Sequence, residues 1–323
     1  MIPPVVLAPL AGGPSTPELA AAVATAGGLG HVAAGYLAPE ELAARLERAR
    51  ELTDGALAVN LFVLAERPVD DAAVAAYRRR LEAEGEEVGE PSFDDDRLAE
   101  KLAIAVAARV AAISTTFGPP PPALADAARA AGIAVWATVA SVEDAVLAAA
   151  SGADVLIAQG AEAGGHRASF DDADERDIPL LELLAGLRDA VDLPLVASGG
   201  IADRATADAA RAAGAVAVQA GTAFLLCPEA GTSAPHREAV SRGGPTSITR
   251  AFTGRRARGI VNRFMLEHPD APSAYPHIHY VTAPLRASAR SAGDAERINL
   301  WAGTNVGLAA ARSAADVVAE LRP

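Results

Sequence analysis

Short apolar runs alternate with longer, Ala-rich amphipathic segments along most of the chain. The apolar runs predict strands at about Val5–Ala8, His31–Ala33, Ala58–Leu61, Val110–Ile113, Ala134–Val139, Val155–Ala158, Leu195–Ala197 and Ala215–Gln219. Helices are expected at about Thr16–Ala26, Pro39–Leu52, Asp94–Ala108, Pro122–Ala131, Ser141–Ser151, Pro179–Val191, Arg204–Ala213 and after Glu229. Such an alternation predicts a parallel sheet buried on both faces, and eight strands are the number that closes a (β/α)8 barrel.

Two segments interrupt this alternation. Residues 65–97 insert a polar, acidic stretch, expected to be helical, after the third strand, and residues 229–323 exceed what a last barrel helix requires. We therefore expect an α/β protein with a TIM barrel over residues 1–228. Residues 229–323 would supply the last barrel helix and a smaller, mainly helical cap. Long additions at the loop-bearing end of a barrel typically cover a site.

Charge and composition narrow the classes of function. The net charge of −13 argues against nucleic acid or an anionic membrane as the main partner. Lys101 is the only lysine and is expected on a solvated helix, so Schiff-base chemistry has almost no candidate. The single cysteine, Cys227, excludes an intramolecular disulfide and any multi-cysteine metal site.

The same features suggest where the protein works. The start, Met1–Pro4, lacks the basic residues of a secretory signal, and glycines interrupt the uncharged stretch 19–39. We expect a soluble cytoplasmic protein, monomeric or homodimeric, with no metal.

Glycine pairs follow two neighbouring predicted strands. Gly199-Gly200 comes after the seventh strand and Gly221-Thr222 after the eighth. A phosphate needs several backbone N–H groups aimed at one point without Cβ atoms in the way, and barrels usually bind phosphate at these strand ends. Either pair alone is better explained as a simple turn, but the two together favour a phosphate site.

His166 is the strongest catalytic candidate. It follows Gly164-Gly165 in the long loop after the sixth strand, and Gln159 precedes that loop. A histidine can take up a proton near neutral pH. A lone histidine here would be a surface residue more often than a base, but its place beside the expected phosphate site favours catalysis.

The other polar clusters leave alternatives open. His31 could face the pocket or be packed, and Glu162 could orient His166 or stay solvated. His277 and His279 could approach each other, but no third metal ligand is evident. His236 is expected on a helix surface, Cys227 buried, and the acidic residues 171–177 hydrated or binding Mg²⁺. The arginines Arg255, Arg256 and Arg258 are either solvated or bind an anion.

Several segments resemble the nitronate monooxygenases, formerly called 2-nitropropane dioxygenases. They are "APLAGGPSTPELAAAVATAGGLGHVAAGY" at 8–36, "VNLFV" at 59–63, "QGAEAGGH" at 159–166, "ASGGIAD" at 197–203, "QAGTAFL" at 219–225 and "TRAFTGRRARGIVNRF" at 249–264. "YPHIHYVTAPLR" at 275–286 and "LWAG" at 300–303 resemble the bacterial class that acts without NAD(P)H. The resemblance covers nearly the whole chain.

This resemblance implies a TIM barrel that binds FMN non-covalently and oxidises nitronates with O2 to carbonyl compounds and nitrite. His166 would be the general base toward a nitroalkane, and a hydrogen-bonding or cationic group toward a nitronate. Cofactor contacts would come from Asn60, Gln159, Gly164, Gly200, Gln219, Ala220, Gly221 and Thr222, and substrate contacts from Tyr275 and Tyr280. Leu10 and His31 depart from the family pattern, which has Met and an apolar residue there.

Rival functions remain open at this point. An FMN-dependent NAD(P)H reductase of enoyl thioesters or quinones would share the "EAGGH" and "SGGI" segments. A non-catalytic barrel that binds a phosphorylated ligand, or a cofactor-free isomerase, would share the glycine turns. A scaffolding protein has little support, because the chain has no heptad repeats or long charged tails.

Overall fold

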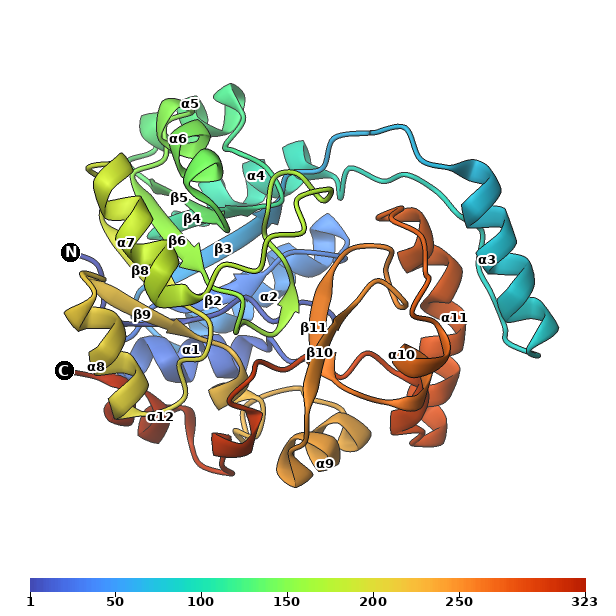
Figure 1. The fold of residues 1–323 in the computed structure, drawn as a ribbon. Coiled ribbons are helices and arrows are strands. Elements are labelled where there is room, and N and C mark those ends of the chain that lie inside the picture. Colours follow the sequence, from blue (N-terminus) through green and yellow to red (C-terminus); the bar gives the residue numbers. More distant parts are fainter.

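Eight parallel strands close into a barrel in the computed structural model, which describes residues 1–323 (Figure 1). The strands are β1 (Val5–Leu7), β2 (Gly30–Ala33), β3 (Leu57–Phe62), β4 (Ala112–Thr116), β5 (Ala134–Val139), β6 (Val155–Gln159), β8 (Leu195–Ser198) and β9 (Ala217–Ala220). Their order is β1-β9-β8-β6-β5-β4-β3-β2. A parallel bridge from Val6 to Leu29 joins the two ends of the sheet. The predicted TIM barrel is therefore confirmed, although β4 begins two residues later than expected.

A ring of helices covers the barrel. It consists of α1 (Pro17–Thr25), α2 (Pro39–Leu52), α4 (Leu98–Ala107), α5 (Pro122–Ala130), α6 (Val142–Ala150), α7 (Leu180–Ala190), α8 (Arg204–Ala212) and α12 (Ala314–Leu321). The last of these, α12, lies against α1 and α8 near both termini (Figure 1). The helix that follows Glu229, α9 (Ala234–Arg242), packs instead with residues of the cap. The ring is thus completed by the C-terminal helix.

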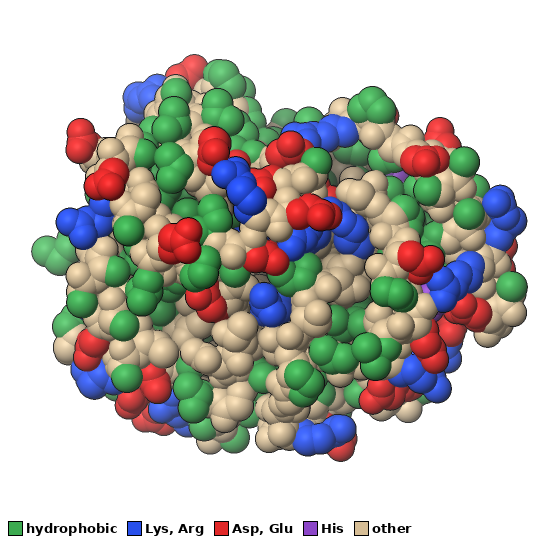
Figure 2. Space-filling model, in the orientation of Figure 1, with side chains coloured by type: hydrophobic (Ala, Val, Ile, Leu, Met, Phe, Trp, Pro, Cys, Tyr) green, Lys and Arg blue, Asp and Glu red, His purple; other side chains and the backbone are tan.

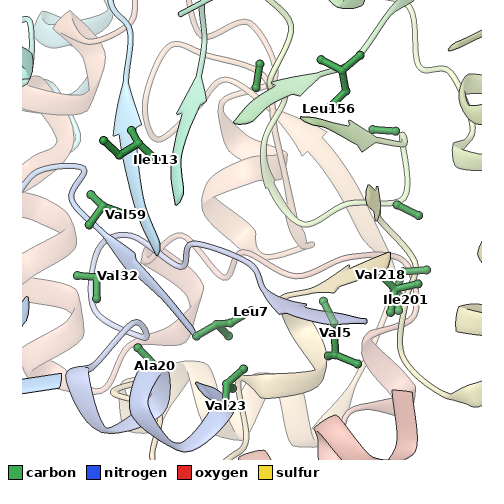
Figure 3. Close-up of a cluster of buried hydrophobic side chains, with 14 of the residues drawn as sticks. Val5, Leu7, Ala20, Val23, Val32, Val59, Ile113, Leu156, Ile201 and Val218 are labelled. Carbon is green, nitrogen blue, oxygen red and sulfur yellow. The ribbon is translucent and has the colours of Figure 1, made fainter. Parts of the chain in front are cut away.

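Alternating side chains on the strands separate two layers of core. Val5 and Leu7 point outward from β1 and pack with Ala20 and Val23 of α1 (Figure 3). Val6, between them, belongs to a second cluster with residues of the other strands. Successive strand residues face opposite sides, so one short strand serves both the barrel interior and the helix layer.

The cap lies beside the barrel (Figure 1). It contains α9, α10 (Arg263–Glu267) and α11 (His277–Ala292), with α3 (Asp71–Ala83) of the inserted segment packed on α11. It also contains a small antiparallel sheet of β10 (Thr246–Thr249), β11 (Ala257–Ile260) and β7 (Gly165–His166). His166 pairs with Ala257 there, so the predicted loop histidine lies on a strand that joins barrel to cap.

The face of the molecule drawn in Figure 2 shows no large area of one charge. Acidic and basic side chains intermingle over the face drawn there, and several gather where barrel and cap meet. Ion pairs at this junction include Arg250–Asp172 and Arg256–Asp177. No helix combines the length and the apolar character that crossing a bilayer requires.

Candidate active site

A cavity of about 450 Å³ lies at the carboxyl ends of the barrel strands, partly covered by the cap. The structure brings together at its walls all nine residues assigned to catalysis or cofactor binding from the sequence: Asn60, Gln159, Gly164, His166, Gly200, Gln219, Ala220, Gly221 and Thr222. Its volume lies within the range of small-molecule and cofactor sites. Its two ends differ in construction.

Backbone groups form the end at β8 and β9. The N–H groups of Gly199, Gly200 and Gly221 find no acceptor within the protein. Gly199 and Gly200 have φ values of 114° and 68°, a region that side chains with a Cβ rarely adopt. Asn305 fixes this turn by donating to the Gly200 carbonyl at 2.7 Å. Three unpaired N–H groups around one space form a cradle for an anion.

Three amide side chains line the wall between the ends. Gln219 donates to Ser198 Oγ at 3.2 Å, and its buried Oε1 has no partner. Asn60 donates to Ser114 Oγ and Thr116 Oγ1, both at 2.9 Å. Gln159, in contrast, mainly fixes the following loop: Nε2 donates to the His166 carbonyl, and Oε1 accepts from the Ala168 N–H at 2.9 Å.

The position of Gly164 requires a glycine for a different structural reason than the other glycines of the site. A Cβ on Gly164 would come within 2.6 Å of the backbone of Ala302 and Gly303. The C-terminal segment therefore requires a glycine at this position, whether or not a ligand approaches it. Gly303 N–H in turn donates to Thr222 Oγ1 at 2.9 Å, which links this segment to the anion cradle.

Aromatic side chains form the opposite end, around His166. Its imidazole lies 5.5 Å from Tyr275, 5.6 Å from Trp301 and 5.8 Å from Phe117 between ring centroids. Its Nε2 is 2.9 Å from Thr253 Oγ1. These neighbours come from the barrel, from the cap and from the segment near residue 300.

His166 is held in its neutral form. Burial, together with the nearby Arg255 and Arg286 cations, lowers its pKa to about 3. In the cavity without an anion the ring is therefore neutral at ordinary pH and can take part in hydrogen bonds. A bound anion would raise this pKa, because it offsets the arginine charges and favours the protonated ring.

Neither of the two tyrosines expected to face substrate lines the cavity. Tyr275 lies behind the lining, where it contacts His166, and its hydroxyl is 3.0 Å from that of Tyr36. Tyr280 is directed elsewhere; its hydroxyl donates to Asp94 Oδ2 at 3.0 Å. Tyr36 does line it and stacks on His279, with ring centroids 4.2 Å apart and planes within 3°. Sequence reasoning singled out neither Tyr36 nor His279 for substrate contact.

Lys101 supports this aromatic end from behind. The sequence placed it on a solvated helix, which is wrong: Lys101 is only 1% exposed. Its Nζ lies 2.7 Å from Asp96 Oδ1 and donates to the Ala34 carbonyl at 3.0 Å. The same Asp96 oxygen accepts from the Tyr36 N–H at 2.9 Å. Helix α4 starts only at Leu98, because Asp96 and Arg97 adopt positive φ to make this contact.

Several other expectations are corrected. His236 is buried, with Nε2 3.2 Å from the Trp301 carbonyl, so it is not on a helix surface. His277 and His279 begin a helix, where residues two apart face different directions, so they do not converge as on a strand. Glu162 accepts from the Leu180 N–H at the start of α7. Cys227 is buried, as expected.

The remaining charged clusters are engaged in protein contacts. Arg255 is buried and donates to the Arg167 and Ser169 carbonyls, and Arg258 donates to the Ala161 carbonyl. The acidic loop 171–177 is tied down by ion pairs: Asp171–Arg67, Asp172–Arg250, Asp174–Arg176 and Asp177–Arg256. These carboxylates thus pair with arginines at the surface, and no three of them lie close enough together to hold a metal ion.

Two arginines give the cavity a positive charge. Arg286 and Arg290 line it, whereas no Asp or Glu does. Arg286 donates to Thr282 Oγ1 and to the His279 carbonyl, and Arg290 has no side-chain partner in the protein. Burial lowers the pKa of both guanidinium groups, that of Arg286 to about 10, so they remain charged near neutral pH. Although the net charge of the protein is −13, no acidic side chain lines this cavity.

A barrel with an anion cradle at neighbouring strand ends and a histidine lining the same cavity is the arrangement of an enzyme active site. The chain belongs to the nitronate monooxygenase family, whose model matches residues 1–323. This places it among the oxidoreductases. It is 38% identical to the nitronate monooxygenase of Pseudomonas aeruginosa, over 98% of this chain and 95% of that protein. It is 33% identical to a probable nitronate monooxygenase of Bacillus subtilis, over 94% and 90%.

Solved structures agree with this assignment. The nitroalkane oxidase of Streptomyces ansochromogenes is 43% identical, with a TM-score of 0.94 over 98% of this chain and 94% of that one. FabK from Thermotoga maritima has a TM-score of 0.79 at 24% identity, over 98% and 91%, a likeness that shows the fold alone. The resemblance inferred from the sequence motifs is confirmed.

Proposed function

We propose that this protein binds FMN and oxidises alkyl nitronates, propionate 3-nitronate among them, with O2 to carbonyl compounds and nitrite. The observation that carries the proposal is that one cavity contains both an anion cradle and a histidine. Unpaired backbone N–H groups at β8 and β9 are available to an anion, and a neutral His166 lies at the other end. Family membership supplies the reaction class.

The residues present fit FMN. The cradle of Gly199, Gly200 and Gly221 offers N–H donors to a phosphate without Cβ atoms in the way. The unpartnered Oε1 of Gln219 can accept from a ligand, and FMN carries hydroxyl and N–H donors. FMN, when bound, supplies the electron-accepting chemistry of the reaction.

The protein side chains would prepare the substrate. Neutral His166 would remove the proton next to the nitro group of a nitroalkane and would hydrogen-bond a substrate that arrives as the nitronate. The nearby Arg255 and Arg286 charges would favour the anionic form of the substrate. The rings of Phe117, Tyr275 and Trp301 would keep water away from this end.

The charge of the cavity supports a substrate with a second anionic group. Arg290 lines the cavity without a side-chain partner, one helical turn beyond Arg286. Arg290 is half-buried, and a ligand carboxylate can bind its guanidinium through two charge-assisted hydrogen bonds. Propionate 3-nitronate carries such a carboxylate, whereas a simple alkyl nitronate does not.

The test is nitrite release from propionate 3-nitronate and from an alkyl nitronate, with oxygen consumption followed and NADH absent. Release of nitrite coupled to oxygen uptake is the expected result. Rapid bleaching of the flavin by NADH without air would point to a reductase instead. A protein that stays colourless after incubation with FMN would contradict the proposal and leave a cofactor-free isomerase or a phosphate-binding barrel.

An Arg290→Met variant tests the preference for a carboxylate-bearing substrate separately from nitronate oxidation itself. We expect KM for propionate 3-nitronate to rise about tenfold, from loss of one charge-assisted bond, with little change for an alkyl nitronate. Arg242→Met is a matched control, because Arg242 is an exposed arginine that pairs only with Glu238. Equal effects of Arg290→Met on both substrates would count against the carboxylate.

A further inference from the structure

A buried histidine outside the described site is connected to it by hydrogen bonds. His31, on β2, is fully buried in the barrel. Its Nδ1 lies 2.9 Å from the Leu7 carbonyl, and its Nε2 lies 3.1 Å from Ser114 Oγ. Ser114 Oγ in turn accepts from Asn60 Nδ2, which lines the cavity. One continuous chain of contacts therefore runs from the barrel interior to the cavity wall.

The Leu7 carbonyl, where this series of hydrogen bonds begins, fixes the direction of every hydrogen bond that follows. The Leu7 carbonyl can only accept, so His31 must carry its proton on Nδ1. Burial lowers the pKa of His31 to about 4, so the ring is neutral and Nε2 can only accept. Ser114 must then donate its hydroxyl hydrogen to Nε2, and its remaining lone pairs accept from Asn60.

The last hydrogen bonds of the series orient the Asn60 amide. Both hydrogens of Asn60 Nδ2 are taken, one by Ser114 Oγ and the other by Thr116 Oγ1. The amide oxygen Oδ1 accepts no hydrogen bond from the protein and is the polar atom that Asn60 can offer to the cavity. Without the histidine, Ser114 could donate to Oδ1 instead, and the amide would present its hydrogens.

We propose that His31 is a positioning residue that acts through Ser114 to hold Asn60 Oδ1 as a hydrogen-bond acceptor for a donor group of the flavin. The inference rests on the proposed FMN site and adds the group that sets the polarity of its wall. It also gives a use to His31, which stands where the family resemblance predicts an apolar residue. Such a residue could not maintain this polarity.

The tautomer of His31 tests the proposed series of hydrogen bonds directly. The protein has six histidines, so ¹⁵N–¹H spectra of histidine-labelled protein are simple enough to assign. The signal of His31 is the one lost in a His31→Gln variant. We expect the Nδ1–H form, with and without FMN. An Nε2–H form would overturn the proposal. Because this measurement does not require FMN to bind, it remains decisive even if the proposed function is wrong.

Flavin affinity and reduction potential test the consequence. In His31→Leu, and also in Ser114→Ala, we expect FMN to bind the apoprotein about tenfold more weakly, from loss of one oriented hydrogen bond. The potential of the bound flavin should shift, since an acceptor is exchanged for a donor. His31→Gln should restore both values, because its amide can donate at one end and accept at the other.

A matched control separates orientation from packing. Trp136 contacts His31 edge to face in the same barrel interior, with centroids 6.5 Å apart, but takes no part in the hydrogen bonds. Trp136→Phe should leave affinity and potential near those of the unmodified protein. Unchanged values in the Leu and Ala variants, or equal changes in Trp136→Phe, would refute the positioning role. Failure of the unmodified protein to bind FMN would instead refute the proposed cofactor.

Discussion

The two ends of the cavity are built in different ways. At β8 and β9, backbone N–H groups in two short turns, Gly199-Gly200 and Gly221, form the anion cradle. Around His166, which lies on β7, side chains from the loop after β4, the segment before α11 and the segment near Trp301 meet across the barrel and the cap. The first end depends on local conformation, whereas the second depends on the tertiary arrangement of distant segments.

This difference predicts how the two ends respond to change. A local backbone site should lose ligand affinity when one residue gains a Cβ, with little effect on the chemistry. A site assembled from distant side chains should lose rate or substrate affinity when its supports are disturbed, with little effect on cofactor retention. Four measurements test this difference.

The largest effect is expected from His166→Asn. Loss of a general base typically lowers a proton-transfer rate by about 10²- to 10⁴-fold, so turnover of a neutral nitroalkane should fall by that range. Turnover of a preformed nitronate should fall much less, because no proton has to be removed. Steady-state rates with both substrates, together with the flavin content, are the measurement. Equal losses on the two substrates would contradict the assignment of the base.

The second largest effect is expected from Lys101→Met, which should lower the free energy of unfolding and disturb the aromatic end of the cavity. Removing the partner of a buried carboxylate typically costs about 3–5 kcal/mol, and Asp96 would be left without its cation. With the Asp96 contact to Tyr36 disturbed, KM should rise while FMN affinity stays constant. The control is Arg97→Met, which removes an exposed pair with Glu100. Loss of FMN binding in folded Lys101→Met would break the proposed separation of the ends.

Gly200→Ala tests the cradle. Its φ of 68° and the approach of a Cβ to Glu162 Cβ at 3.2 Å should displace the turn, and the loss of phosphate contacts should weaken FMN about 10- to 100-fold. Gly132→Ala is the matched control, because Gly132 has a φ of 69° with open space around it and lies far along the chain from the cradle. Titration of apoprotein with FMN gives both affinities. Similar affinities in the two variants would remove the special role of the cradle.

The smallest effect is on stability against pH. Burial lowers the pKa values of His31, His166 and His236 to about 4, 3 and 4. Below about pH 6.5 the unfolded chain takes up these protons first, so the free energy of unfolding should fall with pH down to about pH 4. Each histidine contributes at most about 1.4 kcal/mol per pH unit. Thermal melts of the unmodified protein and of His31→Gln, which should show a shallower slope, check this.

The same contrast explains what could be predicted from sequence. The cradle was found from Gly199-Gly200 and Gly221-Thr222, because a glycine pattern after a strand carries its own geometry. Tyr36 and Lys101 were missed, because their roles depend on Asp96, which lies in an inserted segment 60 residues from Tyr36. A lone lysine among acids indicates a solvated helix, and only tertiary packing overrides that interpretation.

The helices show a similar limit. Eight alternations predicted the barrel, since each strand and helix carries its own periodicity. The identity of the eighth barrel helix could not be read in this way, because α9 and α12 are both short and amphipathic. Only the contacts of α12 with α1 and α8 distinguish the helix that closes the ring.

The pairing of β7 with β11 couples the histidine to the cap. The strand that carries His166 is hydrogen-bonded to the cap through Ala257. The cap therefore cannot move away from the barrel without displacing the imidazole or breaking the hydrogen bonds between β7 and β11. Any displacement of the cap would thus be reported by the environment of this one ring.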